Sequence, residues 1–262
     1  MRIYMMTDIE GVAGVVSFES QSYAEGKYYE QARQLLTAET NAAVEGLYEG
    51  GATDILVVDG HGPGAIVFEQ LDARVRLLHG RPITATQSLR PMWDCDAVVI
   101  IGQHARAGVA TGNLNHSLDS RRIDRIQING REVGEIGLLA ACAGVKDIPM
   151  IFVSGDEDAC EEARQWIPDI STVAVKQGVA RNVAISISAT ESRRRIRQGI
   201  AQAMHRHQRQ PVRPVKLPPP YIVEVKYFHT NIADQAEQQG ARRIDALTVS
   251  RQSSDILEVI YR

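Results

Sequence analysis

Carboxylate and imidazole side chains recur where apolar runs end in the first half of this chain. Seven of them stand after successive apolar segments: Asp8, Glu10, Asp59, His61, His104, His116 and Glu135. Imidazole nitrogen and carboxylate oxygen, without a thiolate, are ligands that suit Zn²⁺ in a catalytic setting, with Mn²⁺ or Co²⁺ as substitutes. The pattern therefore indicates a metal site, and there are enough ligands for two ions.

Two such ions, about 3.5–4 Å apart and bridged by a carboxylate and a hydroxide, form a hydrolytic centre. A carboxylate that follows the first strand is well placed to be the bridge. Residues two apart in an extended segment point to the same side, so Asp8 and Glu10 can face one cation together. His116, in the polar stretch GNLNHSLDS, is compatible with three roles: a further ligand, a proton shuttle or a surface residue.

Each of these residues also has a structural interpretation when it is considered alone. Asp8 can cap a turn or helix, and Glu10 can be a solvated loop residue. His61, in DGHGPG, can belong to a turn, and Glu135 can cap the helix that it precedes. Their joint placement after successive strands favours the metal site.

The elements that would position these side chains alternate between strand and helix. RIYMMT predicts a strand over residues 2–7, and residues 28–51 predict a long amphipathic helix closed by Gly50 and Gly51. A second strand follows in ATDILVVDG, and AVVIIG is a β-branched run typical of a strand buried on both faces. We therefore expect a parallel sheet, whose carboxyl ends gather ligands in a shared crevice.

The second half of the chain is more varied. Asn129 and Gly130 predict a hairpin that leads into a helix ending near Gly144, and a strand, loop and helix follow over residues 148–168. Residues 211–220 hold five of the ten prolines, which indicates a stiff connector. Beyond it, YIVEVKYF, LTVSR and ILEVIYR predict three short strands.

These patterns predict an α/β fold, with a mostly parallel sheet flanked by helices and a smaller C-terminal α+β portion after the proline-rich connector. We place a catalytic domain over residues 1–210 and a C-terminal subdomain over residues 211–262. The two can also form one continuous domain.

Composition narrows the class of protein. Of 262 residues, 44% are hydrophobic and 23% are charged, as in a folded globular protein. A net charge of −3 with no long single-sign block predicts no nucleic-acid or membrane partner. Cys95, Cys142 and Cys160 are odd in number, have no CxxC spacing and fall in or beside apolar segments, so they are expected as buried free thiols. Together with the absence of a leader-like or membrane-spanning apolar stretch, they predict a cytoplasmic protein.

Five motifs together resemble the zinc-dependent D-aminopeptidase family. They are DIEG (8–11), DGHG (59–62), GQHARAG (102–108), NHS (115–117) and VGEIGL (133–138). The similarity is colinear over about the first 180 residues. The set is far more specific than any single motif.

The resemblance implies a role for each matching residue. It makes Asp8 the carboxylate that bridges two zinc ions per subunit. Glu10 and His61 would complete the site of one ion, and His104 and Glu135 would complete the site of the other. His116 would be the catalytic histidine. The implied reaction, carried out by a metal-bridged hydroxide, removes the N-terminal residue from short peptides, preferentially D-residues such as D-Ala. The implied assembly is a ring-shaped homodecamer enclosing a channel.

The sequence departs from the family in two places. Pro63, Gly64 and Ala65 follow DGHG where many relatives have a methionine and an asparagine, and the C-terminal third resembles the family only loosely. Two alternative functions remain at this point. One is a metal-dependent amidase or phosphoesterase acting on another small substrate, with Arg106 as a candidate phosphate ligand. The other is a non-catalytic relative that binds peptides.

Overall fold

A seven-stranded sheet forms the centre of the molecule, in a computed structural model that describes residues 1–260. The strand order is β3-β2-β1-β4-β7-β8-β9, and every neighbouring pair is parallel except β8 and β9. The strands are β1 (Arg2–Thr7), β2 (Asp54–Asp59), β3 (Arg76–Leu78), β4 (Ala97–Gln103), β7 (Met150–Asp156), β8 (Ser171–Ala180) and β9 (Val183–Ser186). The expected parallel sheet is therefore confirmed.

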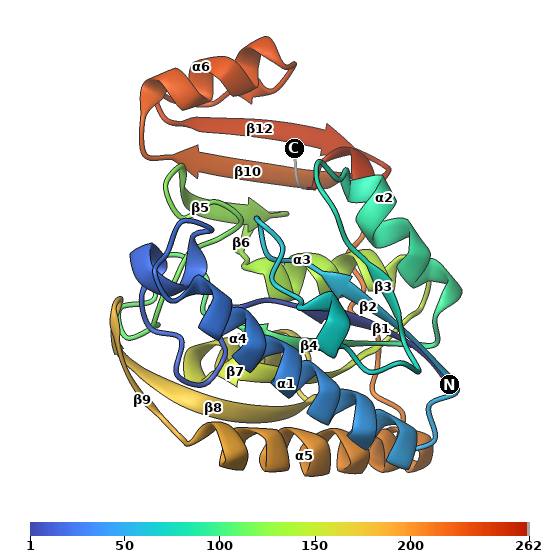
Figure 1. Cartoon of the computed structure of the whole chain (residues 1–262). Coiled ribbons are helices and arrows are strands. Elements are labelled where there is room, and N and C mark those ends of the chain that lie inside the picture. Colours follow the sequence, from blue (N-terminus) through green and yellow to red (C-terminus); the bar gives the residue numbers. More distant parts are fainter. Residues whose placement is uncertain (261–262) are drawn as a thin grey trace.

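Helices cover both faces of this sheet (Figure 1). The two long helices, α1 (Tyr29–Glu49) and α5 (Ala189–Arg209), pack against each other on one face. The opposite face carries α2 (Ala85–Leu89), α3 (Glu135–Gly144) and α4 (Glu157–Trp166). None of the helices within residues 1–260 combines the length and the apolar character needed to cross a membrane.

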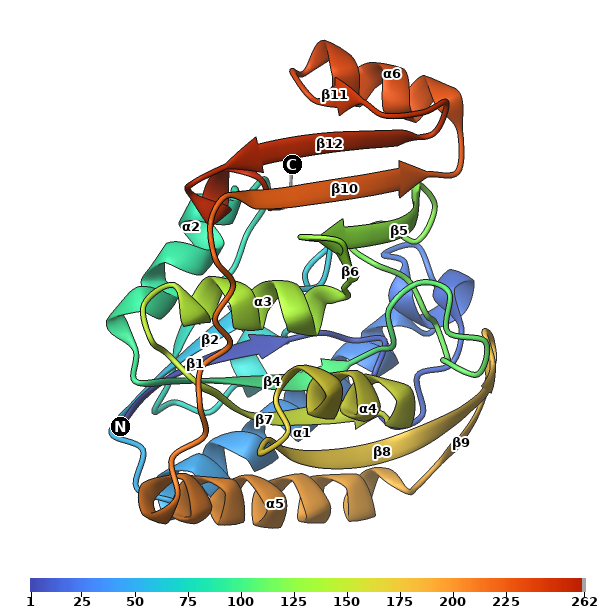
Figure 2. The ribbon, with the colours of Figure 1, turned by 180° about the vertical axis from the view of Figure 1, so that it is seen from behind.

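A second, five-stranded sheet packs over α3, as Figures 1 and 2 both show. It is antiparallel, in the order β11-β12-β10-β5-β6, and α6 (Thr230–Gln238) lies on its outer side. Its strands are β5 (Ile123–Ile128), β6 (Arg131–Glu132), β10 (Tyr221–Tyr227), β11 (Arg242–Arg243) and β12 (Thr248–Ser253). The proline-rich connector runs from the end of α5 past α3 to β10 (Figure 2). The fold thus joins a mostly parallel sheet to a smaller antiparallel one.

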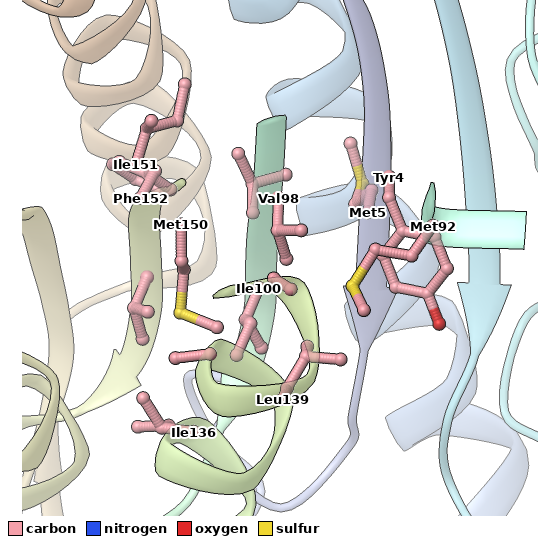
Figure 3. Packing of buried hydrophobic residues seen from close by; sticks show 14 of the residues in the cluster. Tyr4, Met5, Met92, Val98, Ile100, Ile136, Leu139, Met150, Ile151 and Phe152 are labelled. Carbon is pink, nitrogen blue, oxygen red and sulfur yellow. The ribbon is translucent and has the colours of Figure 1, made fainter. Parts of the chain in front are cut away.

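The main core packs against both faces of the seven-stranded sheet, and Figure 3 shows a part of it that includes the side covered by α3. All seven residues of β4 are buried, as expected for a β-branched central strand that is covered on both faces. Leu139 and Ile136 of α3 point towards Ile100 of β4 and Met150 of β7. Burial of such side chains contributes about 1.5–3 kcal/mol each, so this packing fixes α3, and with it Glu135, over the strand ends.

Most of the predicted elements are confirmed, including the hairpin at Asn129 and Gly130 that joins β5 to β6. The strand predicted for ILEVIYR is wrong. Residues Ile256–Glu258 form a 3₁₀ turn instead, because the Asp255 carboxylate accepts a hydrogen bond from the Leu257 N–H and caps that turn. Residues 261–262 of that segment lie outside the described part.

The division at residue 210 stays a prediction. β10, from the later part, pairs with β5, from the earlier part, so the second sheet draws strands from both.

Candidate metal centre

The ends of β1, β2 and β4 bring the candidate ligands together, and two glycines allow the loops after β1 and β4 to approach. The Gly11 N–H donates to the Gly102 carbonyl at 2.7 Å. A β-carbon on Gly11 would overlap the Gln103 carbonyl, and one on Gly102, whose φ is +78°, would overlap the Asp8 carbonyl. The glycines of DIEG and GQHARAG therefore permit a backbone contact that other residues would prevent.

The Asp8 carboxylate lies between two histidines. Its Oδ1 atom is 3.2 Å from His61 Nδ1, and its Oδ2 atom is 3.2 Å from His104 Nε2. Asp8 is 7% exposed, so neither oxygen is freely hydrated. One carboxylate that presents a different oxygen to each of two imidazoles has the arrangement of a bridging ligand.

Glu10 and His61 lie on one side of Asp8. Glu10 Oε2 is 3.2 Å from His61 Nδ1, and the Ser22 hydroxyl donates to Glu10 Oε1 at 2.6 Å. His61 Nε2 is 2.8 Å from the Ser22 carbonyl, which can only accept, so the Nε2–H donates there. In the neutral ring, Nδ1 then presents a lone pair to the two carboxylates. A backbone carbonyl that selects the tautomer in this way is typical of metal-binding histidines.

His104 and Glu135 lie on the other side. Glu135 Oε1, at the first residue of α3, is 3.4 Å from His104 Nε2 and accepts a hydrogen bond from the Leu118 N–H at 2.8 Å. His104 Nδ1 is 2.9 Å from the Ala105 carbonyl and donates to it. The Nε2 atom of neutral His104 is thus left to face Glu135 and Asp8 as a lone pair.

The donor set fits a divalent cation. Glu10 Oε2 and His104 Nε2 are buried without a hydrogen-bond partner among the described residues. Two groups have ligand atoms that all lie within 4.8 Å of one another: Asp8, Glu10 and His104, and His104, His116 and Glu135. Converging lone pairs repel unless a cation or protons lie between them, and oxygen with imidazole nitrogen is the ligand chemistry of Zn²⁺.

The titration behaviour of the cluster shows how protons can substitute for a cation. Burial, followed by repulsion from Glu10, raises the pKa of Asp8 to about 6. Burial alone would lower the pKa values of His61 and His104, but the carboxylates beside them raise both well above the ordinary value. Burial by itself would raise the pKa of the Glu135 carboxyl, but the adjacent His104 outweighs this effect and lowers that pKa to about 2. Protons and cations therefore compete for this cluster.

His116 joins the same cluster. Its ring stacks on that of His104, with centroids 3.8 Å apart, and its Nδ1 atom donates to the Leu114 carbonyl at 2.9 Å. Burial and repulsion from His104 lower the pKa of His116 to about 4, so the ring is neutral and Nε2 carries a lone pair. Leu114 and Leu118, on either side, have φ angles of 53° and 64°. Left-handed non-glycine residues store strain, which is common at functional segments.

Lys176 of β8 is a buried residue that the sequence did not reveal. Its ammonium donates to the carbonyl of Glu10, to the Val15 carbonyl at 2.7 Å and to Asn113 Oδ1 at 2.7 Å. It thereby joins the loop after β1 to the segment that carries His116. A single lysine in an alternating strand gives no signal of burial, because its environment is set by loops more than 60 residues away in the chain.

Other polar residues near the strand ends have structural partners. Asp59 Oδ2 accepts hydrogen bonds from two backbone N–H groups, those of residues 65 and 66, and so holds the turn after β2. The Arg106 guanidinium lies 2.9 Å from the Glu132 carboxylate. The cysteines are free thiols, as expected; Cys142 and Cys160 are buried and Cys95 is half-buried.

A mostly parallel α/β sheet with buried histidines and carboxylates at its carboxyl edge is an arrangement suited to a metal-dependent enzyme, and metal-dependent hydrolases are one class that uses it. The chain belongs to the Peptidase M55 family of D-aminopeptidases, whose family model matches residues 1–262. It is 30% identical over 264 residues to a D-aminopeptidase of Bacillus subtilis (strain 168), an alignment that covers 98% of this chain and 93% of the relative.

The fold is also similar to that of a solved structure. This is the Zn-dependent D-aminopeptidase DppA from Bacillus subtilis, described as a self-compartmentalizing protease, with a TM-score of 0.91 at 28% identity. The superposition covers 98% of this chain and 93% of that one. The resemblance seen in the five motifs is thus confirmed over the full length.

Proposed function

We propose that this D-aminopeptidase binds two zinc ions per subunit and releases N-terminal D-residues, D-Ala among them, from short peptides. The observation that carries the proposal is the Asp8 carboxylate, whose two oxygens face His61 and His104 separately. Glu10 and His61 would hold one ion, and His104 and Glu135 the other. The solved relative is Zn-dependent, which supports zinc as the metal.

Zinc at such a site polarises the peptide carbonyl and activates a water molecule for attack. The residues of the chain then have distinct tasks. The carbonyls of Ser22 and Ala105 keep His61 and His104 in the tautomers that present lone pairs to the ions. His116, neutral and with a free Nε2, takes up a proton and passes it to the leaving amine.

Peptide hydrolysis is favoured over phosphate ester hydrolysis by the surroundings of Arg106. A phosphate-binding site needs an available cation, whereas the charge of this guanidinium is offset by Glu132 at 2.9 Å. The family description, D-aminopeptidase, supports the same choice. Retention of all five ligand positions together with His116 disfavours a relative that only binds peptides.

The proposal is tested by elemental mass spectrometry combined with hydrolysis of D-Ala-D-Ala, on the wild type, Asp8→Ala and His104→Ala. We expect about two equivalents of zinc in the wild type and loss of both metal and activity in the two variants, since Asp8 contributes to both ions. His205→Ala, an exposed histidine of α5, is the matched control and should retain both. Undiminished hydrolysis by wild-type protein without metal would refute the proposal.

We also propose that the protein is a homo-oligomer, with the decamer of the family as the expected assembly. The solved relative is described as a self-compartmentalizing protease, which supports this proposal. In addition, Val179, Val183 and Ile185 of the β8–β9 hairpin are 53%, 53% and 65% exposed at the edge of the main sheet. Exposed apolar side chains along an edge strand are typical of a surface that pairs with another chain.

A further inference from the structure

A cavity of about 160 Å³ adjoins the candidate metal centre on the α3 side of the sheet. The apolar side chains that line it include Met6 of β1, Ile100 of β4, Leu139 of α3, and Ile83 and Ala85. Figure 3 shows Leu139 and Ile100 facing each other between α3 and β4. Asp8 and Glu135 also line the cavity, so it opens directly beside the candidate ligands.

The size and lining of this cavity indicate what it can accept. A buried apolar cavity of about 150 Å³ is large enough for benzene. The cavity beside Asp8 therefore has room for a branched aliphatic or an aromatic side chain, far more than the methyl group of alanine requires. Its lining mixes apolar side chains with polar and charged ones, among them Asp59, Arg81 and Ser88. The apolar part of the lining gains about 0.8 kcal/mol for each methylene group that it buries.

Gln103 contributes a polar group to the same cavity. The residue is 2% exposed, and its side-chain amide nitrogen has no hydrogen-bond acceptor among residues 1–260. Buried amide groups in native proteins nearly always have a partner, so this one needs an acceptor that the described chain does not supply. Because the nitrogen is buried, a carbonyl oxygen of a bound peptide can accept from it once the side chain turns into the cavity.

We propose, on the basis of the function proposed above, that this cavity binds the side chain of the substrate's N-terminal residue. The scissile carbonyl is one bond from the α-carbon of that residue, so a carbonyl held beside Asp8 and Glu135 leaves the side chain within reach of the cavity that Leu139 and Ala85 line. The Gln103 amide donates to a backbone oxygen of the peptide. The enzyme then accepts N-terminal D-leucine and D-phenylalanine as well as D-alanine.

The test compares D-leucine p-nitroanilide with D-alanine p-nitroanilide as substrates of the zinc-loaded protein. Ala85→Phe and Ile83→Trp fill the cavity from two positions. Either variant should lower kcat/KM for D-leucine p-nitroanilide, relative to kcat/KM for D-alanine p-nitroanilide, by at least about tenfold. The reason is that room for one methylene group in an apolar pocket changes selectivity by about 10–200-fold. Both variants should also weaken inhibition by free D-leucine.

Thr86→Phe is the matched control, because it adds the same aromatic ring at an exposed neighbour of Ala85 and should leave the ratio unchanged. Thermal melting confirms that each variant is folded. An unchanged ratio in both folded cavity variants would overturn the proposal. So would a selective change in cleavage of D-Ala-D-Leu relative to D-Ala-Gly, which would assign the cavity to the second residue.

Failure of the proposed function gives a different result. If wild-type protein cleaves neither p-nitroanilide, the aminopeptidase proposal fails, and calorimetric titration with D-leucine still tests the cavity. Binding that is lost in Ala85→Phe and kept in Thr86→Phe supports the cavity as a side-chain site, whereas binding that is equal in the two variants overturns it.

Discussion

Lys176→Met is the substitution that best tests how the interior supports the metal centre. Methionine has a similar length but cannot donate hydrogen bonds. The change leaves the Glu10 carbonyl, the Val15 carbonyl and Asn113 Oδ1 without the donor that they share. Because Lys176 is only 3% exposed, water has little access to replace it.

The magnitude follows from two opposing contributions. Each buried acceptor that loses its partner costs about 1–3 kcal/mol, so three acceptors give a loss of about 3–9 kcal/mol. Burial lowers the pKa of Lys176 from 10.5 to about 8, and relief from holding that buried charge returns about 3 kcal/mol. We therefore expect the free energy of unfolding to fall by about 3 kcal/mol.

Urea denaturation of chelator-treated protein measures this loss without any contribution from bound metal. A loss of about 3 kcal/mol corresponds to a decrease in Tm of about 6–12 °C for a chain of this size. Zinc affinity should also fall, because the loop that carries Glu10 is no longer held to Asn113. Lys27→Met, at an exposed lysine, is the control and should change stability by less than about 0.5 kcal/mol.

A Lys176→Met protein whose stability and zinc content both match the wild type would refute the reasoning. It would mean that the three acceptors find other partners, and that Glu10 is positioned by Ser22 and the Gly11 backbone alone.

Two further predictions concern pH and assembly. Burial raises the pKa of Glu39 from 4.5 to about 7, so the neutral carboxyl stabilises the fold below about pH 4.5 and this contribution is lost as pH rises through 7. In urea denaturation, the free energy of unfolding of Glu39→Gln should rise by about 3 kcal/mol relative to that of the wild type between pH 4.5 and pH 8. A stability difference that stays constant over this pH range would contradict the prediction. Sedimentation analysis should give the mass of an oligomer for the wild type and a smaller mass for Ile185→Asp. A wild-type protein that sediments as a monomer would contradict the proposed assembly.

The sequence by itself determined the parts of this protein that depend on local pattern. Buried β-branched runs such as AVVIIG predict strands, and a polar residue directly after each run must lie at the carboxyl edge of a parallel sheet. That topology alone brings Asp8, His61 and His104 together, whatever the details of packing. The glycines at 11 and 102 were visible in the motifs, but the backbone contact that requires them appears only in the structure.

Only the tertiary structure decided which partner each of these side chains meets. The tautomers of His61 and His104 depend on carbonyls in the loop around Ser22 and at Ala105, and Lys176 reaches acceptors 63 and 166 residues away in the chain. The strand predicted over ILEVIYR failed because a single cap at Asp255 outweighs the β-propensity of the residues that follow. The pairing of β10 with β5 and the cavity beside Asp8 are likewise set by packing between distant segments, and local sequence carries no record of those contacts.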